Sequence, residues 1–340
     1  MSAVRPPIAP MLARLAEEIP REGHLYEPKW DGFRAIVFRD REEIDIRSRH
    51  DRPLARYFPE LVAAFRDVHA ESFVLDGEIV IIGPRAFDFG AVMLRLHPAE
   101  TRVQRLARET PATFIAFDVL AIGDEDLRSR PFAERRGCLE RLITSAPPAI
   151  VLTPISDDPR AAREWLRASA GTGIDGVMAK PRALAYRPGV RAMTKVKLRR
   201  TADCVVAGMR ELPDGSVASL LLGLYEDGAL RHVGVVVSMP RQQRSELARE
   251  LAPLVVPLEG HPWERGFGLG QSPMGRLGGS AGRWDPAEMS IDWTPLRPDL
   301  VAEVRYDTVD AGRFRHPARF VRWRPDREPR SCTRAQLSTS

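Results

Sequence analysis

Lysine is nearly absent from this chain of 340 residues. The sequence contains 51 lysines and arginines, and the only lysines among them are Lys29, Lys180, Lys195 and Lys197. Arginine keeps its proton under all practical conditions, whereas lysine can lose its proton and act as a nucleophile. A chain that uses arginine wherever a charge suffices marks its few lysines as candidate site residues. Drift under a GC-rich codon bias is the alternative explanation, and it would leave lysines without a common role.

Cysteine and long apolar runs are also scarce. The three cysteines, Cys138, Cys204 and Cys332, lie far apart, so they form no CxxC pair and predict neither a zinc site nor a disulfide framework. No apolar run approaches the roughly 18 residues of a membrane span, and the first 15 residues lack the apolar segment of a signal peptide. These absences predict a cytoplasmic protein without a membrane segment.

The composition predicts a folded protein of two domains. Hydrophobic residues make up 44% and charged residues 29% of the chain, which excludes disorder, and 340 residues are many for one core. The net charge of +5 permits a nucleic-acid partner without establishing one. Residues 1–200 carry 33 basic and 28 acidic side chains, and residues 201–340 carry 18 of each, so a basic face would have to come from local clustering.

In the first 200 residues, strands and helices are predicted to alternate. Residues 6–20 are expected to be largely extended. Apolar spacing predicts helices at 54–66, 86–95, 132–144 and 160–170, and strands at 26–39, 44–48, 73–82, 113–120, 174–180 and 194–198. A turn from Pro28 to Gly32 separates two strands, which would present Lys29 at a sheet edge.

Several carboxylates fall inside apolar strands. Asp76 and Glu78 interrupt the strand at 73–82, and Asp175 lies near the start of the strand at 174–180. A buried carboxylate needs a cation, a ligand hydroxyl or a paired base. A tight hairpin at Asp76 and Gly77 is the alternative, but apolar residues continue on both sides. The alternation at 194–198 places Lys195 and Lys197 on one face.

No lysine follows Lys197, and the pattern changes there. Short strands are predicted at 204–208, 219–225, 230–238, 300–306 and 319–323, with one helix at 241–251. About five strands with one helix favour a small barrel of the OB type, which often binds nucleic acid. Residues 259–290 are rich in glycine and predict a long surface loop. The predicted domains are therefore 1–200 and 201–340.

These features together suggest nucleotidyl transfer. A nucleophilic lysine needs a pKa lowered by burial or by neighbouring cations, which Lys195, Lys197 and Arg34 could supply while also clamping phosphates. Glu78 and Asp175 could hold a sugar hydroxyl or Mg²⁺.

An aromatic residue, Phe117, could stack on a base. An amine that attacks a nucleotide phosphate forms a lysyl phosphoramidate. Schiff-base chemistry is the competing use of a reactive lysine, but it explains neither the carboxylates nor the lysine pair.

The order of these motifs resembles the covalent nucleotidyltransferase superfamily, and most closely its ATP-dependent DNA ligases of the bacterial ligase C type. The resemblance covers nearly the whole chain and rests on six motifs. Residues 29–34, Lys-Trp-Asp-Gly-Phe-Arg, resemble the K-x-D-G-x-R motif, which implies that Lys29 becomes AMP-lysine and that Arg34 contacts the nucleotide. The resemblance assigns Glu27 to the adenine amino group, and it places Arg49, in Ser48-Arg49, near the ribose and the nick phosphate.

The other motifs follow in the family's order. Residues 76–78 resemble the D-G-E motif, which places Glu78 on the ribose or a metal, and Phe117 resembles the aromatic residue that stacks on adenine. Residues 175–180 resemble E-G-h-h-h-K, with Met178 on the other adenine face, and residues 195–197 resemble the K-x-K motif on the α-phosphate.

The last motif lies in the second domain. Residues 324–327 resemble R-x-D-K, which implies that Arg324, Asp326 and Arg327 orient the leaving pyrophosphate. The chain departs from the family pattern twice. Asp175 stands where many relatives have glutamate, which puts its metal contact in doubt. Arg327 stands where many have lysine, and a charge aimed at pyrophosphate tolerates that exchange.

The resemblance implies an α+β protein, with an ATP-grasp-like adenylation (nucleotidyltransferase) domain followed by an all-β OB-fold domain. It implies a ligase that seals 5′-phosphate/3′-hydroxyl nicks in DNA repair, with ATP as co-substrate and Mg²⁺, or Mn²⁺, at Glu78 and Asp175. The implied partners are nicked duplex DNA and a repair protein such as a primase-polymerase. The implied protein is a cytoplasmic, nucleoid-associated monomer.

Contacts with DNA are assigned to two segments. Because only 28 residues precede Lys29, the helical DNA-binding domain of larger ligases is expected to be absent. The first proposed contact is a basic loop with Arg182, Arg187 and Arg191. The second is the glycine-rich insert, with Trp263, Phe267, Arg276 and Trp284. A solvated, inert loop is the alternative for the insert.

Other functions would share part of this pattern. An RNA ligase or an mRNA-capping guanylyltransferase would also carry Lys29 and the phosphate clamp. A non-catalytic, nucleic-acid-binding repair scaffold is an alternative from another class, but the retention of all four lysines at family lysine positions argues against it.

Overall fold

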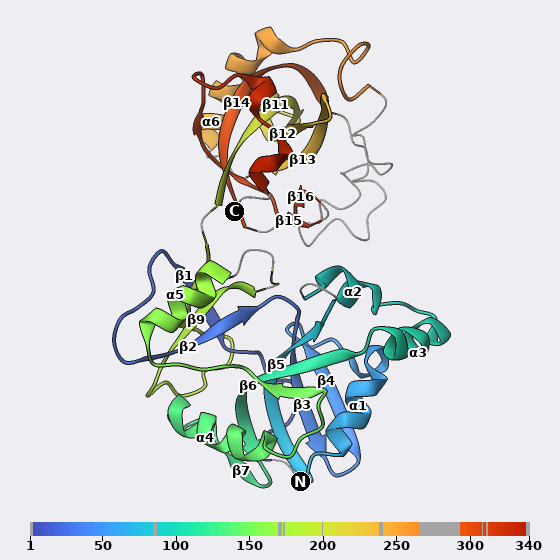
Figure 1. Ribbon diagram of the computed structural model, residues 1–340, viewed down its shortest axis with the longest axis vertical. Helices are drawn as coiled ribbons and strands as arrows, with labels where there is room; N and C mark the ends of the chain where they lie inside the picture. Colours follow the sequence, from blue (N-terminus) through green and yellow to red (C-terminus); the bar gives the residue numbers. More distant parts are fainter. Residues whose placement is uncertain are drawn as a thin grey trace. The chain divides into compact units, whose positions relative to one another are not determined.

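The computed structural model describes residues 3–83, 87–168, 172, 174–198, 200–237, 241–264, 293–307, 309–310 and 312–337. The chain divides into two compact units, Met1–Leu198 and Arg199–Ser340 (Figure 1). Among the helices of the described residues, none combines the length and the apolar character that crossing a membrane requires.

The first unit contains two sheets. The larger has the order β4-β3-β5-β6-β7, with β8 paired to β6. Its strands are β3 (Phe33–Asp40), β4 (Glu43–Ser48), β5 (Ser72–Ile81), β6 (Ala112–Ile122), β7 (Glu125–Asp126) and β8 (Ile150–Leu152). The smaller has the order β1-β10-β9-β2. Its strands are β1 (Leu12–Ala16), β2 (His24–Trp30), β9 (Ile174–Pro181) and β10 (Arg191–Val196).

The two faces of the larger sheet belong to different apolar cores, because successive side chains of a strand point to opposite faces. Ala35 and Val37 of β3 pack in a cluster with apolar residues of α1 and α4. Ile36 and Phe38 pack instead in a cluster with residues of β1, β2 and β10. The second cluster therefore joins the two sheets.

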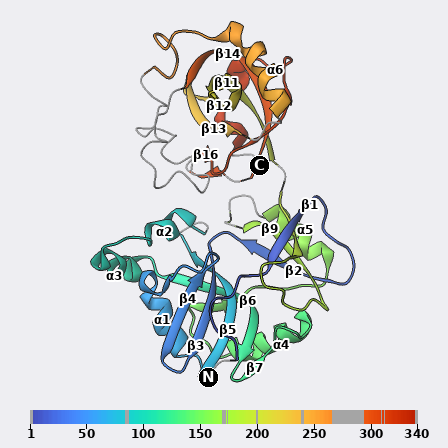
Figure 2. The same ribbon diagram turned by 180° about the vertical axis from the view of Figure 1, so that it is seen from behind.

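Helices cover the outer faces of this unit. They are α1 (Pro59–Arg66), α2 (Phe89–Leu94), α3 (Glu100–Glu109), α4 (Phe132–Ile143) and α5 (Pro159–Ala168). Ala162 of α5 packs on Tyr26 and Val177, so α5 lies against β2 and β9, next to which both ribbon views draw it (Figures 1 and 2). The helix expected at 54–66 is split into a 3-10 turn at Ala55–Tyr57 and α1, which has proline at its start.

One helix was not expected from the sequence. In α3 only Val103 and Ala107 are buried, and most of its other residues are charged or polar, so few apolar residues mark the helix in the sequence. The helix expected at 86–95 is observed as α2, and Ala86 lies outside the described residues. The acid-containing segment at 73–82 forms the single strand β5, so the alternative of a hairpin turn at Asp76 is wrong.

The second unit is a β-rich barrel. Its sheet has the order β13-β12-β11-β14-β17. The strands are β11 (Arg200–Glu211), β12 (Val217–Glu226), β13 (Ala229–Val236), β14 (Thr294–Tyr306) and β17 (Arg319–Trp323). The helix α6 (Arg241–Leu251) lies between β13 and β14 in the chain, and the short pair β15 (Val309–Asp310) and β16 (Arg313–Phe314) lies between β14 and β17. All five predicted strands and the helix are observed, which confirms the β-rich prediction.

The surface-loop prediction for 259–290 is wrong at its beginning. Trp263 is 2% exposed, and its Nε1 donates to the carbonyl of Leu230 at 2.9 Å. His261 is buried as well, and both rings pack edge-on against Trp293. Trp263 therefore belongs to the barrel core and cannot contact DNA. Phe267, Arg276 and Trp284 lie outside the described residues.

Candidate active site

Lys29 lies in β2, an edge strand of the smaller sheet, which confirms the predicted edge position. The turn predicted from Pro28 to Gly32 is wrong at its beginning, because Pro28, Lys29 and Trp30 belong to β2. The next two residues, Asp31 and Gly32, carry the chain from β2 to β3 in the larger sheet. A Cβ atom on Gly32 would come within 2.2 Å of the carbonyl oxygen of Ile79. Glycine is therefore required for the chain to cross this closely above β5 and to hold Lys29 near the carboxylates of that strand.

Asp175 joins Lys29 to a second lysine. Its Oδ2 lies 2.5 Å from Lys29 Nζ and 3.0 Å from Lys197 Nζ. The next residue, Gly176, has a φ of +126°, and a Cβ atom there would lie 2.2 Å from the carbonyl oxygen of Val196. Only glycine allows β9 and the end of β10 to approach so closely. The fold thus brings Lys29 and Lys197, far apart in sequence, to one carboxylate.

The lysines of this cluster lower the pKa values of Asp175 and Lys195. Burial alone would raise the pKa of Asp175, but Lys29 and Lys197 outweigh burial, and the pKa is lowered. Burial lowers the pKa of Lys195, and the charges of Lys29 and Lys197 lower it further, with a smaller contribution from Arg49. Lys29, Lys195, Lys197 and the exposed Arg49 therefore form one cationic group that suits a chain of phosphates.

Glu27 and Lys180 form a buried ion pair beside this cluster. Glu27 Oε2 lies 2.7 Å from Lys180 Nζ, and the two side chains are 2% and 3% exposed. Within the described part of the chain, Glu27 Oε1 is buried without a hydrogen-bond partner. Burial raises the pKa of Glu27, and Lys180 opposes that rise. A buried acceptor without a donor is a fitting partner for a ligand amino group.

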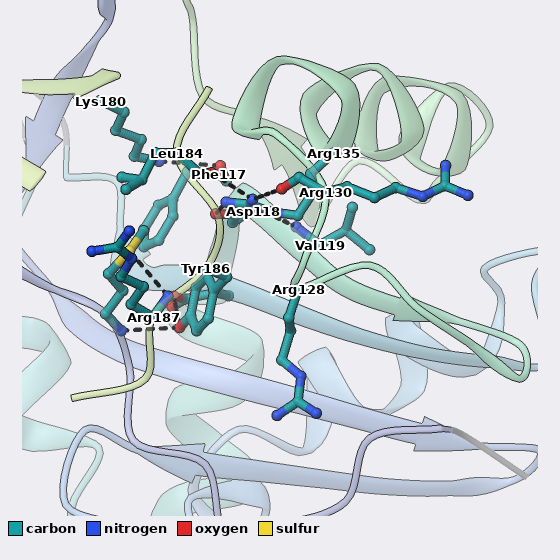
Figure 3. Close-up of polar contacts among 12 residues, drawn as sticks. Phe117, Asp118, Val119, Arg128, Arg130, Arg135, Lys180, Leu184, Tyr186 and Arg187 are labelled. Atoms are coloured by element: carbon teal, nitrogen blue, oxygen red, sulfur yellow. Dashed lines mark hydrogen bonds and ion pairs between the residues drawn. The ribbon is translucent and has the colours of Figure 1, made fainter. Parts of the chain in front are cut away.

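Lys180 also holds the predicted stacking residue. Its Nζ donates to the carbonyl of Phe117 at 3.2 Å and lies 4.8 Å from the centroid of the Phe117 ring (Figure 3). The guanidinium carbon of Arg34 lies 5.3 Å from the same ring, which is partly exposed. The sequence marked Lys180 as a candidate but gave it no role. The structure makes it the link between Glu27 and Phe117.

Arg34 is held by a carboxylate that the sequence did not place in the site. Its Nε and Nη2 donate to the two oxygens of Asp76 at 3.0 and 2.6 Å. The hydroxyl of Tyr186 donates to Asp76 at 2.6 Å and accepts the backbone N–H of Met11 at 3.1 Å. Asp76 raises the pKa of Arg34 against the opposing effect of burial. Arg34 is therefore held in one orientation by Asp76, which is itself held by Tyr186.

A second buried pair supports the strand that carries Phe117. Arg135 Nε and Nη2 each donate to an oxygen of Asp118 at 2.8 Å, and Arg135 Nη1 donates to the carbonyl of Leu184 (Figure 3). Arg135 is fully buried and Asp118 is 1% exposed. Leu184 and Tyr186 both lie between β9 and β10, so the connection between these strands is fastened to β5 through Asp76 and to β6 through Asp118.

Met178 lies half-buried on β9, where it pairs with Glu27 of β2 and with Lys195 of β10. Its neighbours on both sides are thus predicted site residues. The strand register therefore brings together residues whose roles in adenine and phosphate binding were inferred separately.

Glu78 lies close to Lys29 on β5. Its Oε1 accepts the backbone N–H of Gly32 at 3.1 Å. Burial raises the pKa of Glu78 from its usual 4.5 to about 7, although Lys29 and Arg34 act in the opposite direction. Near neutral pH this carboxyl can therefore either release or hold a proton, depending on which charges surround it.

The raised pKa makes a prediction for the nucleotide-free protein. Because the folded state holds a proton that the unfolded state releases between pH 4.5 and 7, the contribution of Glu78 to stability falls as the pH rises through about 7. Glu78→Gln removes this penalty while retaining an acceptor for Gly32. We compare the free energy of unfolding of Glu78→Gln with that of the wild type. We expect this difference to shift in favour of Glu78→Gln by about 1–2 kcal/mol when the pH is raised from 5 to 8.5, a value reduced to allow for the partial exposure of Glu78.

Urea unfolding at both pH values, with EDTA present, measures this gain. Glu71→Gln, which alters an exposed carboxylate of the same unit, is the control. An equal effect of Glu78→Gln at the two pH values would contradict the prediction.

The carboxylates at the site are too few to bind a metal ion by themselves, but they fit an ion that is also bound by the phosphates of a substrate. In the part of the chain that the structure describes, no group of three or more His, Cys, Asp or Glu side chains could hold an ion. Mg²⁺ is usually bound by one or two carboxylates together with waters and substrate phosphates. Glu78 fits this role, whereas Asp175 is already neutralised by two lysines.

The arginine-rich motif lies in the second unit. Arg324 Nη2 donates to Asp326 at 2.7 Å, and Arg324 Nη1 donates to both oxygens of Asp203 at 2.9 and 3.0 Å. Arg327 Nε lies 3.2 Å from Asp203. The hydrogen bonds from Arg324 lower the pKa of Asp326 to about 2. Sequence reasoning found the motif but missed Asp203, which lies 121 residues before Arg324.

The basic loop between β9 and β10 is exposed, as a nucleic-acid contact requires. Arg182, Arg187 and Arg191 all face solvent, and Arg182 Nη1 lies 3.3 Å from Asp157. Their contact with DNA stays a prediction.

The sequence matches two family models. Residues 10–197 match the model described as an ATP dependent DNA ligase domain, and residues 213–327 match the ATP dependent DNA ligase C terminal region.

Curated relatives carry related names. The chain is 50% identical to DNA ligase C2 of Mycolicibacterium smegmatis over 99% of this chain and 96% of that protein. It is 31% identical to the multifunctional non-homologous end joining protein LigD of Mycobacterium bovis over 96% of this chain but only 40% of that protein.

A solved structure shares the fold. It comes from a study of DNA binding with a minimal scaffold by Lig E DNA ligases. The two chains superpose with a TM-score of 0.58 at 17% identity, over 93% of this chain and 100% of that one. This likeness supports the fold assignment of a nucleotidyltransferase domain with an OB-fold domain.

Proposed function

The chain belongs to the family of ATP-dependent DNA ligases, and from this premise we propose how its residues divide the reaction. It is a DNA-repair ligase of the bacterial ligase C type. We assign adenylation to residues 1–200 and the OB fold to residues 201–340. The observation that carries the proposal is the cluster of Lys29, Lys197 and Asp175.

In the first step Lys29 Nζ attacks the α-phosphorus of ATP. A nitrogen–phosphorus bond forms and the bond from the α-phosphorus to the pyrophosphate oxygen breaks. Nζ loses two of its three protons to solvent, one before it attacks and one as the new bond forms, and keeps the third. Asp175, at 2.5 Å, orients Nζ. Lys195 and Lys197 stabilise the charge on the α-phosphate, where preorganised cations have their largest effect. Arg324, Asp326 and Arg327 orient the leaving pyrophosphate.

Two further steps use the same phosphate-binding lysines, Lys195 and Lys197. The 5′-phosphate of a nick attacks AMP-lysine and takes the AMP, which restores the lysine. The 3′-hydroxyl then attacks the 5′-phosphorus, and AMP leaves. We assign the ribose and the nick phosphate to Arg49, which is exposed and whose charge contributes to the lowered pKa of Lys195.

Adenine recognition falls to residues of three strands. Glu27 Oε1, buried without a donor among the described residues, accepts from the adenine amino group. Phe117 and Met178 contact the two faces of the ring. Guanine has a carbonyl where adenine has the amino group, and a buried carboxylate facing that carbonyl would repel it.

The carboxylate of Glu78 is assigned to the ribose and to a metal ion. Arg34 and Glu78 contact the nucleotide, and Glu78 would hold Mg²⁺ or Mn²⁺. Asp175, the second carboxylate expected to bind the metal, is paired with Lys29 and Lys197 instead. The ion when bound supplies positive charge to the phosphate oxygens.

The proposed partner is nicked duplex DNA, contacted by Arg182, Arg187 and Arg191 along the phosphate backbone. The insert with Phe267, Arg276 and Trp284 remains a candidate for a second contact, whereas Trp263 is excluded by its burial. We further propose a monomer in the cytoplasm, associated with the nucleoid, that works with a repair protein such as a primase-polymerase.

A nick-sealing assay tests the assignment of substrate. We expect sealing of a nicked DNA duplex with ATP and Mg²⁺, and at least about 100-fold less with GTP, because one mismatched polar contact in a buried site is enough for such discrimination. Glu27→Gln should narrow the gap between ATP and GTP. Preferential sealing of a nicked RNA duplex, or equal use of GTP, would contradict the assignment.

A further inference from the structure

One carboxylate of the second unit holds both arginines of the motif at 324–327. Asp203 lies on β11 and its side chain is 14% exposed. It accepts from Arg324 Nη1 through both oxygens, at 2.9 and 3.0 Å, and Arg327 Nε lies 3.2 Å from its Oδ2. Arg324 is hydrogen-bonded to this anion and Arg327 is held near it by charge alone, so moving the anion would reorient Arg324 and remove the attraction on Arg327.

Arg324 is fixed on both sides of its guanidinium group. Nη1 faces Asp203, while Nε and Nη2 face Asp326 at 2.9 and 2.7 Å. The backbone N–H of Arg324 donates to the carbonyl of Val301 on β14 at 2.8 Å. A guanidinium group paired along two edges keeps a single orientation, unlike one free to rotate.

Asp203 is in turn held by its own backbone. Its N–H donates to Gln336 Oε1 at 3.0 Å, and its carbonyl accepts from Gln336 Nε2 at 3.1 Å. Gln336 Nε2 also lies within hydrogen-bond distance of the carbonyl of Thr333. The position of the carboxylate is therefore set by β11 and by the segment around Gln336, and not by the arginines that it holds.

We propose that Asp203 is a positioning residue for adenylyl transfer, which aims Arg324 and Arg327 at the pyrophosphate that leaves when Lys29 is adenylylated. This inference rests on the proposed function. Pyrophosphate leaves only in the first step, so the effect of Asp203 is confined to that step. A residue needed only for the stability of the barrel would affect all three steps together.

Asp203→Asn tests the proposal in the full chain, since asparagine has the same shape and keeps the backbone bonds to Gln336. The first step is followed as single-turnover transfer of AMP from ATP to the enzyme. The later steps are followed with enzyme adenylylated in advance by long incubation with ATP, freed of ATP, and mixed with nicked DNA. We expect the first step to slow about 10- to 100-fold, as misplaced groups at a reacting centre do. The change should be in kcat with little change in KM for ATP.

A matched variant controls for loss of an ion pair in the same unit. Glu226→Gln breaks the pair between Glu226 and Arg334, which involves neither motif arginine. It should leave the first step within about twofold of the wild type, as loss of a partly exposed pair would. Should Asp203→Asn fail to fold, Gln336→Ala decides the same question, because it releases the backbone of Asp203 and should slow only the first step.

The outcomes are distinct. A selective loss in the first step, with nick sealing by the adenylylated variant at the wild-type rate, supports the proposal. An unchanged first step, or a parallel loss in all steps that follows the melting temperature, overturns it. Failure of the wild-type protein itself to take up AMP would instead overturn the proposed function.

Discussion

Lys29→Arg is expected to abolish transfer of AMP from ATP to the protein, with a loss of at least about 1,000-fold in the rate of the first step. Arginine retains the positive charge beside Asp175, so the ion pair at 2.5 Å has a substitute and the fold should persist. The guanidinium group cannot be deprotonated at the pH of the reaction, so no nucleophile remains. Gel electrophoresis after incubation with ATP labelled at the α-phosphate measures the effect.

A pre-adenylylated nick separates loss of the nucleophile from loss of the site. In such DNA the AMP already sits on the 5′-phosphate, and the final step needs no amine at position 29. We expect Lys29→Arg to seal this substrate at a rate within about tenfold of the wild type. Label on the Lys29→Arg protein would place the nucleophile elsewhere.

Arg135→Met is expected to have the largest effect on stability, a loss of about 3–5 kcal/mol in the free energy of unfolding. The variant leaves Asp118, 1% exposed, without its two hydrogen bonds from Arg135. It also removes the donor to the carbonyl of Leu184. Urea unfolding followed by circular dichroism measures the loss.

Arg128→Met is the matched control, because Arg128 makes the same kind of paired contact with Asp126 at the surface. These side chains are 34% and 40% exposed, and such a pair contributes about 0–1 kcal/mol. Combining Arg135→Met with Asp118→Asn should recover part of the loss, since no buried charge then lacks a partner. Equal losses for Arg135→Met and Arg128→Met would show that burial does not set the effect.

The sequence predicted the elements of the first unit well because their signals are local. The edge position of Lys29 follows from a short motif that carries its own turn, and β5 follows from a run of apolar residues that continues past Asp76. Rarity was an equally useful signal. Lys29, Lys195 and Lys197 gather around one carboxylate, as a chain that keeps lysine only for special uses would arrange them.

The partners of the site residues could not be predicted in the same way. Asp76 binds Arg34 and Tyr186, and Asp203 binds Arg324, across separations of 42 to 121 residues. The apolar strand around Asp76 predicted that this carboxylate would need a cation, but nothing local identified Arg34 as its partner. These pairings depend on strand register, which is set only when the sheets assemble.

At Trp263 the local sequence pattern predicted the wrong structure. Its glycine-rich, polar surroundings predicted a loop, yet the side chain packs into the barrel core against Trp293. One large aromatic ring can bury enough surface to anchor a segment whose composition is otherwise typical of solvent-exposed chain.

Intact mass spectrometry after incubation with ATP and Mg²⁺, followed by mapping of the modified peptide, tests the central claim most directly. We expect one added adenylyl group, carried by the peptide that contains Lys29 and removed by excess pyrophosphate. A mass unchanged by ATP, or an adenylyl group on Lys180, Lys195 or Lys197, would contradict it.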